Sequence, residues 1–325
     1  MQKQRVLVTG GAGFIGSELV RQLAARGLHV RVVDNLATGR RENLEDLDEN
    51  VELLVADIRD RQAMNSVLRS TDIVFHLACL GAQHSTSSPG EIHEVNGSAS
   101  LELLIAARDA GVNRFVYVSS SGVYGAVRTA PITEEHPTQP MTVYGASKLA
   151  GEAYTRALWE TYNFPTVVLR LFDAYGPRCR HAGDGGEVIS KFMLRCLAGK
   201  PMVIFGDGTQ AQDLTFVSDA AHGILSAGFS DAAVGHTFNL GSGKEIKIEE
   251  FARVVAQVAG KQDAQVEHVE PISEGALPVL ADCSKTKTLL GFEPAVTLLQ
   301  GLTQLRDWYL TQDDSPQELL EQEVA

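Results

Sequence analysis

Tyr144 and Lys148 are four residues apart in the segment YGASK, a spacing that places both side chains on one face of a helix. Free tyrosine has a pKa near 10 and is a poor base at neutral pH. Neighbouring cations, Lys148 among them, favour the phenolate, and a drop of about three pKa units corresponds to roughly 4 kcal/mol. The pair therefore suits proton abstraction. A surface tyrosine and lysine on an amphipathic helix would show the same spacing, so the rest of the chain has to decide.

Three consecutive serines, Ser119 to Ser121, stand at the end of the stretch RFVYVSSS, which is otherwise strand-like. Serine hydroxyls after a strand most often bond to nearby backbone groups and end regular structure. The triplet alone therefore leaves open whether any of these hydroxyls takes part in chemistry.

The elements that would position these residues alternate along the first half of the chain. Runs that are apolar on nearly every residue predict strands buried on both faces, which is typical of a parallel sheet covered by helices. The predicted strands are RVLVT, HVRVVD, VELLVAD, DIVFHLA, RFVYVSS and PTVVLRLF, and the segments from Phe14 to Arg26, from Glu91 to Ala110 and from Tyr144 to about Tyr162 are predicted helices.

A glycine-rich segment, TGGAGFIG from Thr9 to Gly16, links the first predicted strand to the first predicted helix. Small residues there let backbone amides and the helix N-terminus approach a pyrophosphate. Asp34 ends the second strand 18 residues beyond Gly16, where a carboxylate can bind ribose hydroxyls. The pattern predicts a dinucleotide site, although glycine-rich turns also serve simple strand-to-helix packing.

Asp34 would repel a 2′-phosphate, so we expect NAD rather than NADP, with Arg40 and Arg41 as the nearby residues that argue the other way. An oxidised nicotinamide would be a second cation beside Tyr144. Asp57 and Ile58 follow the third strand and flank the adenine, unless they form an ordinary loop. The expected NAD-binding residues are Gly10, Gly13, Phe14, Ile15, Gly16, Asp34, Asn35, Asp57, Ile58, Leu77, Ala78 and Lys148.

Length and composition set the frame for these motifs. The chain has 325 residues, of which 44% are apolar, and this is enough for two domains. A net charge of -13 without a basic block argues against nucleic acid or an anionic membrane as the partner, and favours a small molecule. Four cysteines without a CxxC pair or metal-ligand spacing suggest reduced thiols and no zinc site. With no signal-peptide series and no membrane-length apolar run, we expect a cytoplasmic protein.

The pattern becomes less regular after Leu171. We expect residues 1–173 to form a Rossmann-type NAD-binding domain, joined by a returning segment near 212–243, and residues 174–325 to form a smaller α/β substrate domain. The acidic end after Thr311, QDDSPQELLEQEVA, is expected to be solvated and frayed.

Taken together, the motifs of residues 4 to 310 resemble the extended short-chain dehydrogenases/reductases, in particular the NAD-dependent nucleotide-sugar epimerases and dehydratases. The motifs that carry this resemblance are TGGAGFIG, VDNLATG, FHLAC, SSSGVYG, YGASKLAGE, LRLFDAYGPR, IFGDGTQAQDLTFVSD, FNLGSG and ADCSKTKTLLGFEP. It implies that a hydroxyl four residues before Tyr124, which is Ser120, binds the substrate hydroxyl together with Tyr144. Ser119 is then a possible backup and Ser121 is structural. It also implies a homodimer formed through the helices at about 91–110 and 144–162.

The same resemblance bears on the reaction. Dehydratases of the family carry an acidic pair directly after the catalytic hydroxyl, and related decarboxylases carry a glutamate at the second position, whereas this chain has Ser121 and Gly122. We therefore expect an epimerase that oxidises a sugar at C4 and returns the hydride to the other face. The alternatives are a net dehydrogenase or reductase, a 4,6-dehydratase, and a catalytically silent NAD-binding regulator.

Several positions that hold the substrate in the family differ here. The usual asparagine is Asp173, the usual arginine of T-R-D-F is Gln212, an arginine expected before ALPVLAD is replaced by Ser273 and Glu274, and another is Gln83, beside His84. Losing guanidinium groups should weaken diphosphate binding. The expected substrate-binding residues are Ser119, Ser120, Tyr144, Asp173, Gln83, Arg178 and Gln212, and Arg178, Arg180, Lys191 and Lys244 are candidate replacement cations unless they are ordinary solvated charges.

Overall fold

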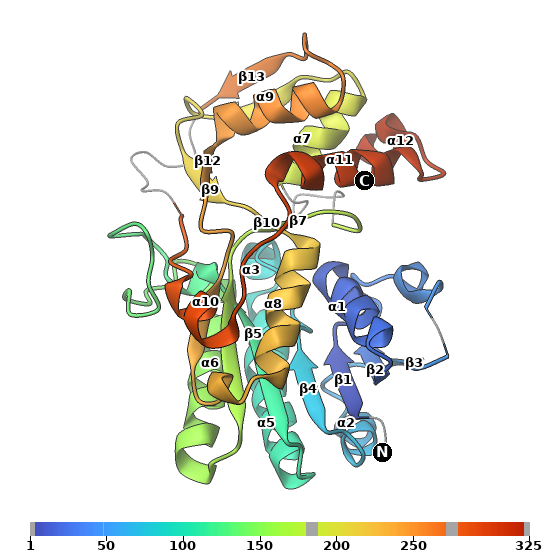
Figure 1. Ribbon diagram of the computed structural model, residues 1–325, viewed down its shortest axis with the longest axis vertical. Helices are drawn as coiled ribbons and strands as arrows, with labels where there is room; N and C mark the ends of the chain where they lie inside the picture. The colour runs from blue at the N-terminus through green and yellow to red at the C-terminus, as the bar shows by residue number, and fades with distance from the viewer. Residues whose placement is uncertain (1–3, 48, 180–187, 271–278, 322–325) are drawn as a thin grey trace.

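The structure is a computed structural model and describes residues 4–47, 49–179, 188–270 and 279–321. A parallel sheet with the strand order β11–β6–β5–β4–β1–β2–β3 forms its centre (Figure 1). The strands are β1 Arg5–Thr9, β2 His29–Asp34, β3 Val51–Val55, β4 Ile73–His76, β5 Arg114–Ser120, β6 Thr166–Leu171 and β11 Thr237–Leu240. The strand order reverses between β1 and β4, so the carboxyl ends of these strands border a crevice of the kind that binds ligands in open α/β sheets.

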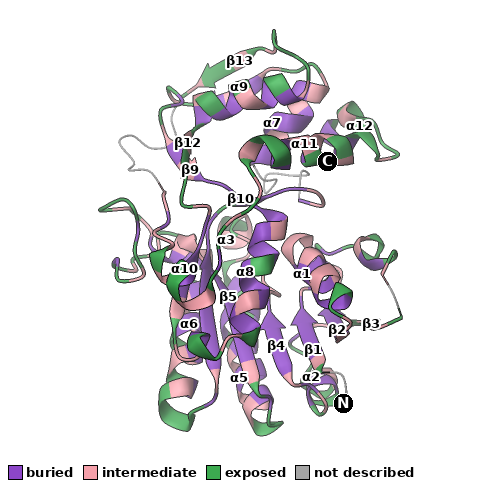
Figure 2. Ribbon diagram, viewed as in Figure 1, coloured by how far each residue is buried: buried purple, intermediate pink, exposed green. Residues whose placement is uncertain are grey.

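Helices cover both faces of this sheet, as the apolar strands require. Within β1, Val6 and Val8 pack toward α1 (Phe14–Ala25) and α8 (Val217–Phe229), which lie against each other on one face. Leu7 faces the opposite way, toward α2 (Arg61–Leu68), α5 (Ser100–Asp109) and α6 (Val143–Tyr162). Figure 2 shows the central strands almost entirely buried between the two helical layers. The predicted doubly wound α/β fold is confirmed.

The segment from 91 to 110 was predicted as one helix, and the structure corrects this. It contains α4 (Pro89–Ile92), a π-helical stretch (His93–Ala99) and α5. In the π-helical stretch, the buried Asn96 side chain exchanges hydrogen bonds with the backbone N–H and C=O of Leu80, at 2.8 and 2.9 Å. The amide side chain therefore holds the loop after β4, and such local widening often occurs at functional sites.

A second, smaller lobe lies above the sheet in Figure 1. It comprises α7 Val188–Leu197, β8 Met202–Phe205, β9 Ala211–Asp213, β12 Glu245–Lys247, α9 Ile248–Val258, β13 Val266–Val269, α11 Leu298–Leu310 and α12 Pro316–Glu321, around a separate apolar core. The paired strands β7 (Ala174–Tyr175) and β10 (Thr215–Phe216) lie between the lobes, and α8, β11 and α10 (Ser284–Leu290) return to the first lobe. Among the described residues, no helix is both long and apolar enough to cross a membrane.

The predicted frayed end after Thr311 was wrong for residues up to 321. The chain forms α12, whose Leu319 and Leu320 are buried in the core of the second lobe near α7. The acidic composition of this segment predicted a solvated end. Burial of two leucine side chains is nevertheless enough to hold a short helix against an existing core. The remaining short elements are α3 His84–Ser87 and the 3₁₀ turns η1 Arg41–Leu44, η3 Ser121–Val123 and η4 Asp231–Ala233.

Candidate active site

The turn between β1 and α1 has the geometry that a dinucleotide pyrophosphate requires. Gly10 has a φ of 72°, in the left-handed region that favours glycine. A Cβ atom on Gly16 would lie 2.1 Å from the carbonyl oxygen of Gly10, so only glycine allows this approach of helix and turn. Gly13 precedes α1 without a side-chain cap, which leaves backbone N–H groups at the helix N-terminus for an anion.

Asp34 ends β2 at the side of this turn. Its Oδ2 accepts a hydrogen bond from the Ala12 N–H at 3.0 Å, and its Oδ1 accepts one from the Leu36 N–H at 2.9 Å. Burial raises the pKa of this carboxyl above its ordinary value, and the two N–H donors partly offset the effect. Since each carboxylate oxygen has a second lone pair, Asp34 can still accept hydrogen bonds from ribose hydroxyls.

Asp57 and Asn35 lie at the same end of the site. The Asn35 amide donates to Asp57 Oδ2 at 2.9 Å, and the Arg59 guanidinium binds both oxygens of Asp57, at 2.8 and 2.9 Å. Arg59 therefore holds the pKa of Asp57 down at about 2, so this carboxylate is ionised at any working pH. Ile58 is buried beside them and offers an apolar surface to a flat base.

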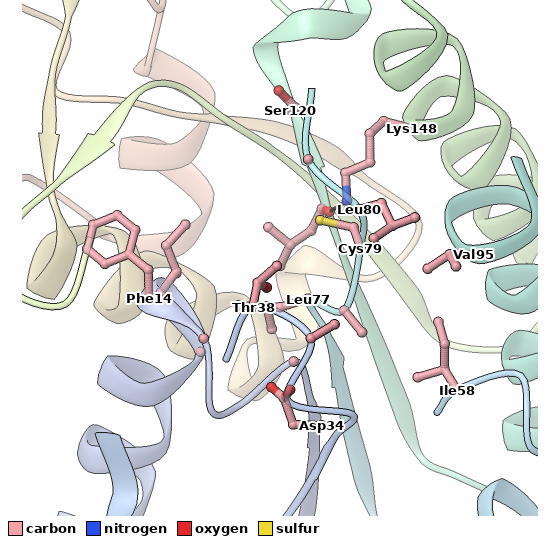
Figure 3. A pocket seen from close by; sticks show the side chains of 18 of the residues that line it. Phe14, Asp34, Thr38, Ile58, Leu77, Cys79, Leu80, Val95, Ser120 and Lys148 are labelled. Carbon is pink, nitrogen blue, oxygen red and sulfur yellow. Dashed lines mark hydrogen bonds between the residues drawn. The ribbon is translucent and has the colours of Figure 1, made fainter. Parts of the chain in front are cut away.

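These groups line one pocket of about 350 Å³ at the carboxyl ends of the strands. Figure 3 shows Asp34 and Ile58 toward one end, and Ser120 and Lys148 at the other. All expected cofactor residues line it, namely Gly10, Gly13, Phe14, Ile15, Gly16, Asp34, Asn35, Asp57, Ile58, Leu77, Ala78 and Lys148. The glycine turn thus fits the pyrophosphate of NAD, and the Asp34 carboxylate fits a ribose. We expect the nicotinamide to lie beside Lys148.

Lys148 is held tightly at its end of the pocket. It is 4% exposed, and its Nζ donates to the carbonyl oxygen of Val118 in β5 at 2.7 Å. The ammonium also lies 5.1 Å from the centre of the Tyr117 ring, a cation–π distance. Tyr144 lies one helical turn earlier in α6 and lines the same pocket. This arrangement places a fixed positive charge on the helix face that carries the phenol.

The structure distinguishes between the serines at the end of β5. The buried Ser119 donates its hydroxyl proton to Glu152 Oε1 at 2.6 Å. Ser120 is partly exposed, lines the pocket, and accepts a hydrogen bond from the Gly122 N–H at 3.1 Å. Because an accepting hydroxyl keeps its own proton available, Ser120 can donate to a substrate oxygen, whereas the proton of Ser119 is engaged.

Asp173 and Gln83 also line the pocket. The side chain of Asp173 is exposed at the pocket. Desolvation by the protein around it, together with the nearby charge of Asp213, raises its pKa to about 6. In Asp213 itself, one carboxylate oxygen binds Ser242 and the other binds the backbone N–H groups of Gly243 and Ala281. A carboxylate that titrates near neutrality thus faces the site where the resemblance implies an asparagine.

Other expected substrate residues are elsewhere. Arg178 binds Glu18 of α1 at 2.6 Å and Ser17 at 3.1 Å, so its charge is already paired outside the pocket lining. Gln212 lies in β9, opposite Ile246 of β12, and is not a lining residue of the pocket either. Lys244 is exposed near β12, Lys191 lies in α7, and His84 begins α3. Arg180, Ser273 and Glu274 lie outside the described residues.

Sequence reasoning missed several contributors. Ser85 accepts a hydrogen bond from the Tyr144 N–H at 3.1 Å, and Thr142 caps α6 by accepting from the Gly145 N–H at 3.0 Å. Thr38, Cys79 and Leu80 line the pocket (Figure 3). A threonine before YGASK is a recognisable N-cap signal, but nothing in the sequence could have placed Ser85 against Tyr144.

Comparisons with known proteins agree with this site. The NAD dependent epimerase/dehydratase family matches residues 6–241. A UDP-glucose 4-epimerase from Mycolicibacterium smegmatis is 34% identical over 310 residues, covering 94% of this chain and 98% of its own. The Thermus thermophilus UDP-glucose 4-epimerase, solved with NAD, is 34% identical with a TM-score of 0.85, covering 95% and 99% of the two chains.

A dTDP-glucose 4,6-dehydratase from Streptomyces venezuelae, also solved with NAD, is 31% identical with a TM-score of 0.86, and the match covers 94% of this chain and 97% of that one. Epimerases and dehydratases thus share both the sequence pattern and the fold. This chain belongs to the NAD dependent epimerase/dehydratase family.

Proposed function

We propose that this protein is an NAD-dependent 4-epimerase of a nucleotide sugar or a related glycosyl compound. The observation that carries the proposal is the end of the pocket lined by Ser120, Tyr144 and Lys148, where Gly122 lies close to Ser120 and Tyr144. The similarity to UDP-glucose 4-epimerases of nearly the same length supports it.

In this proposal Tyr144 is the general base. As a phenolate, it takes the proton of the sugar hydroxyl and later returns it to the oxygen after the sugar has turned over. The ammonium of Lys148, held by the carbonyl oxygen of Val118, supplies a positive charge that stabilises the phenolate. Ser120 donates to the reacting oxygen and keeps it at hydrogen-bond distance from Tyr144. NAD, when bound by the glycine turn and Asp34, supplies a reversible hydride acceptor.

Asp173 lines the pocket and bears on which substrate it accepts. A carboxylate at position 173 repels a diphosphate when it is ionised, whereas it accepts hydrogen bonds from hydroxyl or amino groups. We propose that the glycosyl group contacts Asp173 through such a donor. A substrate that carries such a donor should therefore be preferred.

The experiment is a panel of UDP-, TDP-, GDP- and CDP-sugars, incubated with the purified protein and followed by proton NMR. The proposal expects a new anomeric or ring-proton signal of the 4-epimer and no steady change in the absorbance of reduced NAD. A steady change would instead identify a net dehydrogenase or reductase. Loss of water from the sugar would identify a 4,6-dehydratase, and a protein that binds NAD but turns over no sugar would be a silent regulator.

We propose a homodimer formed through the outer faces of α5 and α6. On α6, Val143, Ala146, Ala153 and Ala157 are exposed, and these small apolar side chains allow another helix to pack closely. Sedimentation velocity tests this directly: Ala153→Glu should give a monomer, whereas Ala25→Glu, at an exposed position of α1 on the other face of the sheet, should not change the mass.

We also propose that the protein works in the cytoplasm, where its four cysteines, all free thiols, would stay reduced. The division into residues 1–173 with a returning segment near 212–243 and residues 174–325 remains a proposal. The return of α8 and β11 to the first lobe supports it.

A further inference from the structure

A buried ionic group lies directly behind the proposed catalytic residues. Glu152 of α6 has no exposed surface, and it is four residues, or about one helical turn, after Lys148. Arg170 of β6 binds it through Nε and Nη2 at 3.0 and 2.8 Å, and Arg156 adds a contact at 3.1 Å. Two guanidinium groups thus surround this buried carboxylate and satisfy its oxygens.

Glu152 and Lys148 together fix β5 against α6. Lys148 Nζ binds the carbonyl oxygen of Val118 at 2.7 Å, and Glu152 Oε1 accepts the hydroxyl proton of Ser119 at 2.6 Å. Two successive turns of the helix thus hold two successive residues of the strand, and the next residue is Ser120. A slide of β5 along α6 would have to break both bonds.

The same group also holds the chain on the far side of Ser120. Arg170 Nη1 donates to the hydroxyl oxygen of Tyr124 at 3.0 Å, and that hydroxyl donates to Asn239 Oδ1 at 2.6 Å. Burial raises the pKa of Tyr124 to about 12, so its hydroxyl stays protonated and both bonds persist at working pH. The segment that carries Ser120 is therefore bound to one network at Ser119 and again at Tyr124.

From this geometry we infer that Glu152 is a positioning residue for the reaction, acting through the hydroxyl of Ser119 to hold Ser120 at the distance that Tyr144 requires. The inference rests on the catalytic roles of Ser120 and Tyr144 in the proposed function. It assigns Ser119 a role different from that of a backup hydroxyl. Ser119 acts only through Ser120.

A double-mutant cycle tests this assignment with the variants Ser119→Ala, Ser120→Ala and their combination. The assay uses the nucleotide sugar that the wild-type protein turns over fastest in the panel above, so failure of the proposed function appears before any variant is compared. We expect Ser119→Ala to lower kcat about tenfold through misplacement, with KM and NAD affinity changed by less than about twofold.

In the Ser120→Ala background, the same substitution should cause no further loss, because the residue that it positions is already gone. An equal loss in both backgrounds would mean that Ser119 acts independently of Ser120 and would overturn the inference. A larger loss in the Ser120→Ala background would overturn it in favour of a backup hydroxyl.

Thr155→Val is the matched control. Thr155 is buried in the same helix and donates its hydroxyl proton to the Gly151 carbonyl oxygen at 2.7 Å, without binding β5. It should match Ser119→Ala in lost melting temperature but retain wild-type kcat. If the control lowered kcat as much as Ser119→Ala, a general loss of packing would explain the result and the inference would fall.

Discussion

Ser120 and Gly122 face each other at the catalytic end of the pocket, where the Ser120 hydroxyl accepts the Gly122 N–H at 3.1 Å. A Cβ atom on Gly122 would lie 3.4 Å from Ser120 Oγ and 3.8 Å from the ring of Tyr144, which are ordinary contact distances. A side chain would therefore fit there and would point at the reacting groups. Because residue 122 is a glycine, this position supplies no acidic side chain beside Ser120 and Tyr144.

Turnover in deuterium oxide should give product without carbon-bound deuterium. A 4-epimerase returns the hydrogen that it removed from the carbon, whereas dehydration or epimerisation beside a ketone passes through a carbanion that exchanges with solvent. The glycine at 122 removes the side chain best placed for that second route. Proton and deuterium NMR of the product checks this. Deuterium at any ring or side-chain carbon would contradict the 4-epimerase assignment.

Tyr144→Phe should lower kcat by on the order of a hundredfold or more, because only the proton-transfer group is lost. NAD binding should stay nearly intact, since Asp34 lies at the other end of the pocket from Ser120 and Lys148 (Figure 3). Steady-state kinetics and NAD titration give both values. Tyr162→Phe, an exposed position at the end of the same helix, is the control. Near-wild-type turnover in Tyr144→Phe would show that Tyr144 is not the general base.

The apoprotein should bind NAD much more tightly than NADP, and Asp34→Ala should narrow the difference. The substitution removes a ribose acceptor and the charge that repels a 2′-phosphate. It also frees the Ala12 and Leu36 N–H groups, so NAD affinity should fall about tenfold or more. Calorimetric titration measures both cofactors. Asp57→Ala, which disrupts the Arg59 pair instead, should change them equally, and equal affinities in the wild type would show that Asp34 does not select the cofactor.

Asp173→Asn should alter how stability depends on pH. In the folded protein Asp173 keeps its proton up to about pH 6, whereas the unfolded chain loses it near the ordinary value of 3.8. Between these values the folded state binds more protons, so stability falls as pH rises, and the loss is complete above about pH 6. The variant, which cannot ionise, should therefore melt slightly higher than the wild type at pH 8 and converge with it near pH 4, and the difference stays small because solvent screens the charge of this exposed side chain.

Melting curves across this pH range provide the measurement, with Asp46→Asn as a control of opposite sign. Arg21 holds the pKa of Asp46 below its ordinary value, so removing that exposed charge should lower the melting temperature slightly at neutral pH. A constant difference between Asp173→Asn and wild type from about pH 4 to about pH 8 would show that Asp173 does not titrate in this window.

Local patterns predicted the fold well. The ends of β1, β2 and β5 coincide with the predicted runs, because polar or glycine residues on both sides of an apolar run fix where the strand begins and ends. The cofactor lining was predictable for the same reason, since a glycine turn and a carboxylate at the end of the next strand fix both ends of the site.

The errors came from partners far apart in the chain. Arg178 looked like a free cation near the substrate, but the fold brings it to Glu18, 160 residues earlier. The exchange between Asn96 and Leu80 accompanies a π-helical stretch that no periodicity signals. In the same way, the bond from Ser119 to Glu152 separates the roles of neighbouring serines whose sequence context is nearly identical. Single-sequence patterns do not record such pairings.

Neighbouring residues of the short strand β9 differ in how much the fold depends on their side chains. Ala211 and Asp213 are buried, and Asp213 joins the loops at Ser242 and Ala281, whereas Gln212 between them is partly exposed. Alternation along a strand thus separates a position that the architecture needs from a neighbour that it does not. The side chain of residue 212 can therefore change at little cost in stability, whereas a change of Asp213 would release the loops at Ser242 and Ala281.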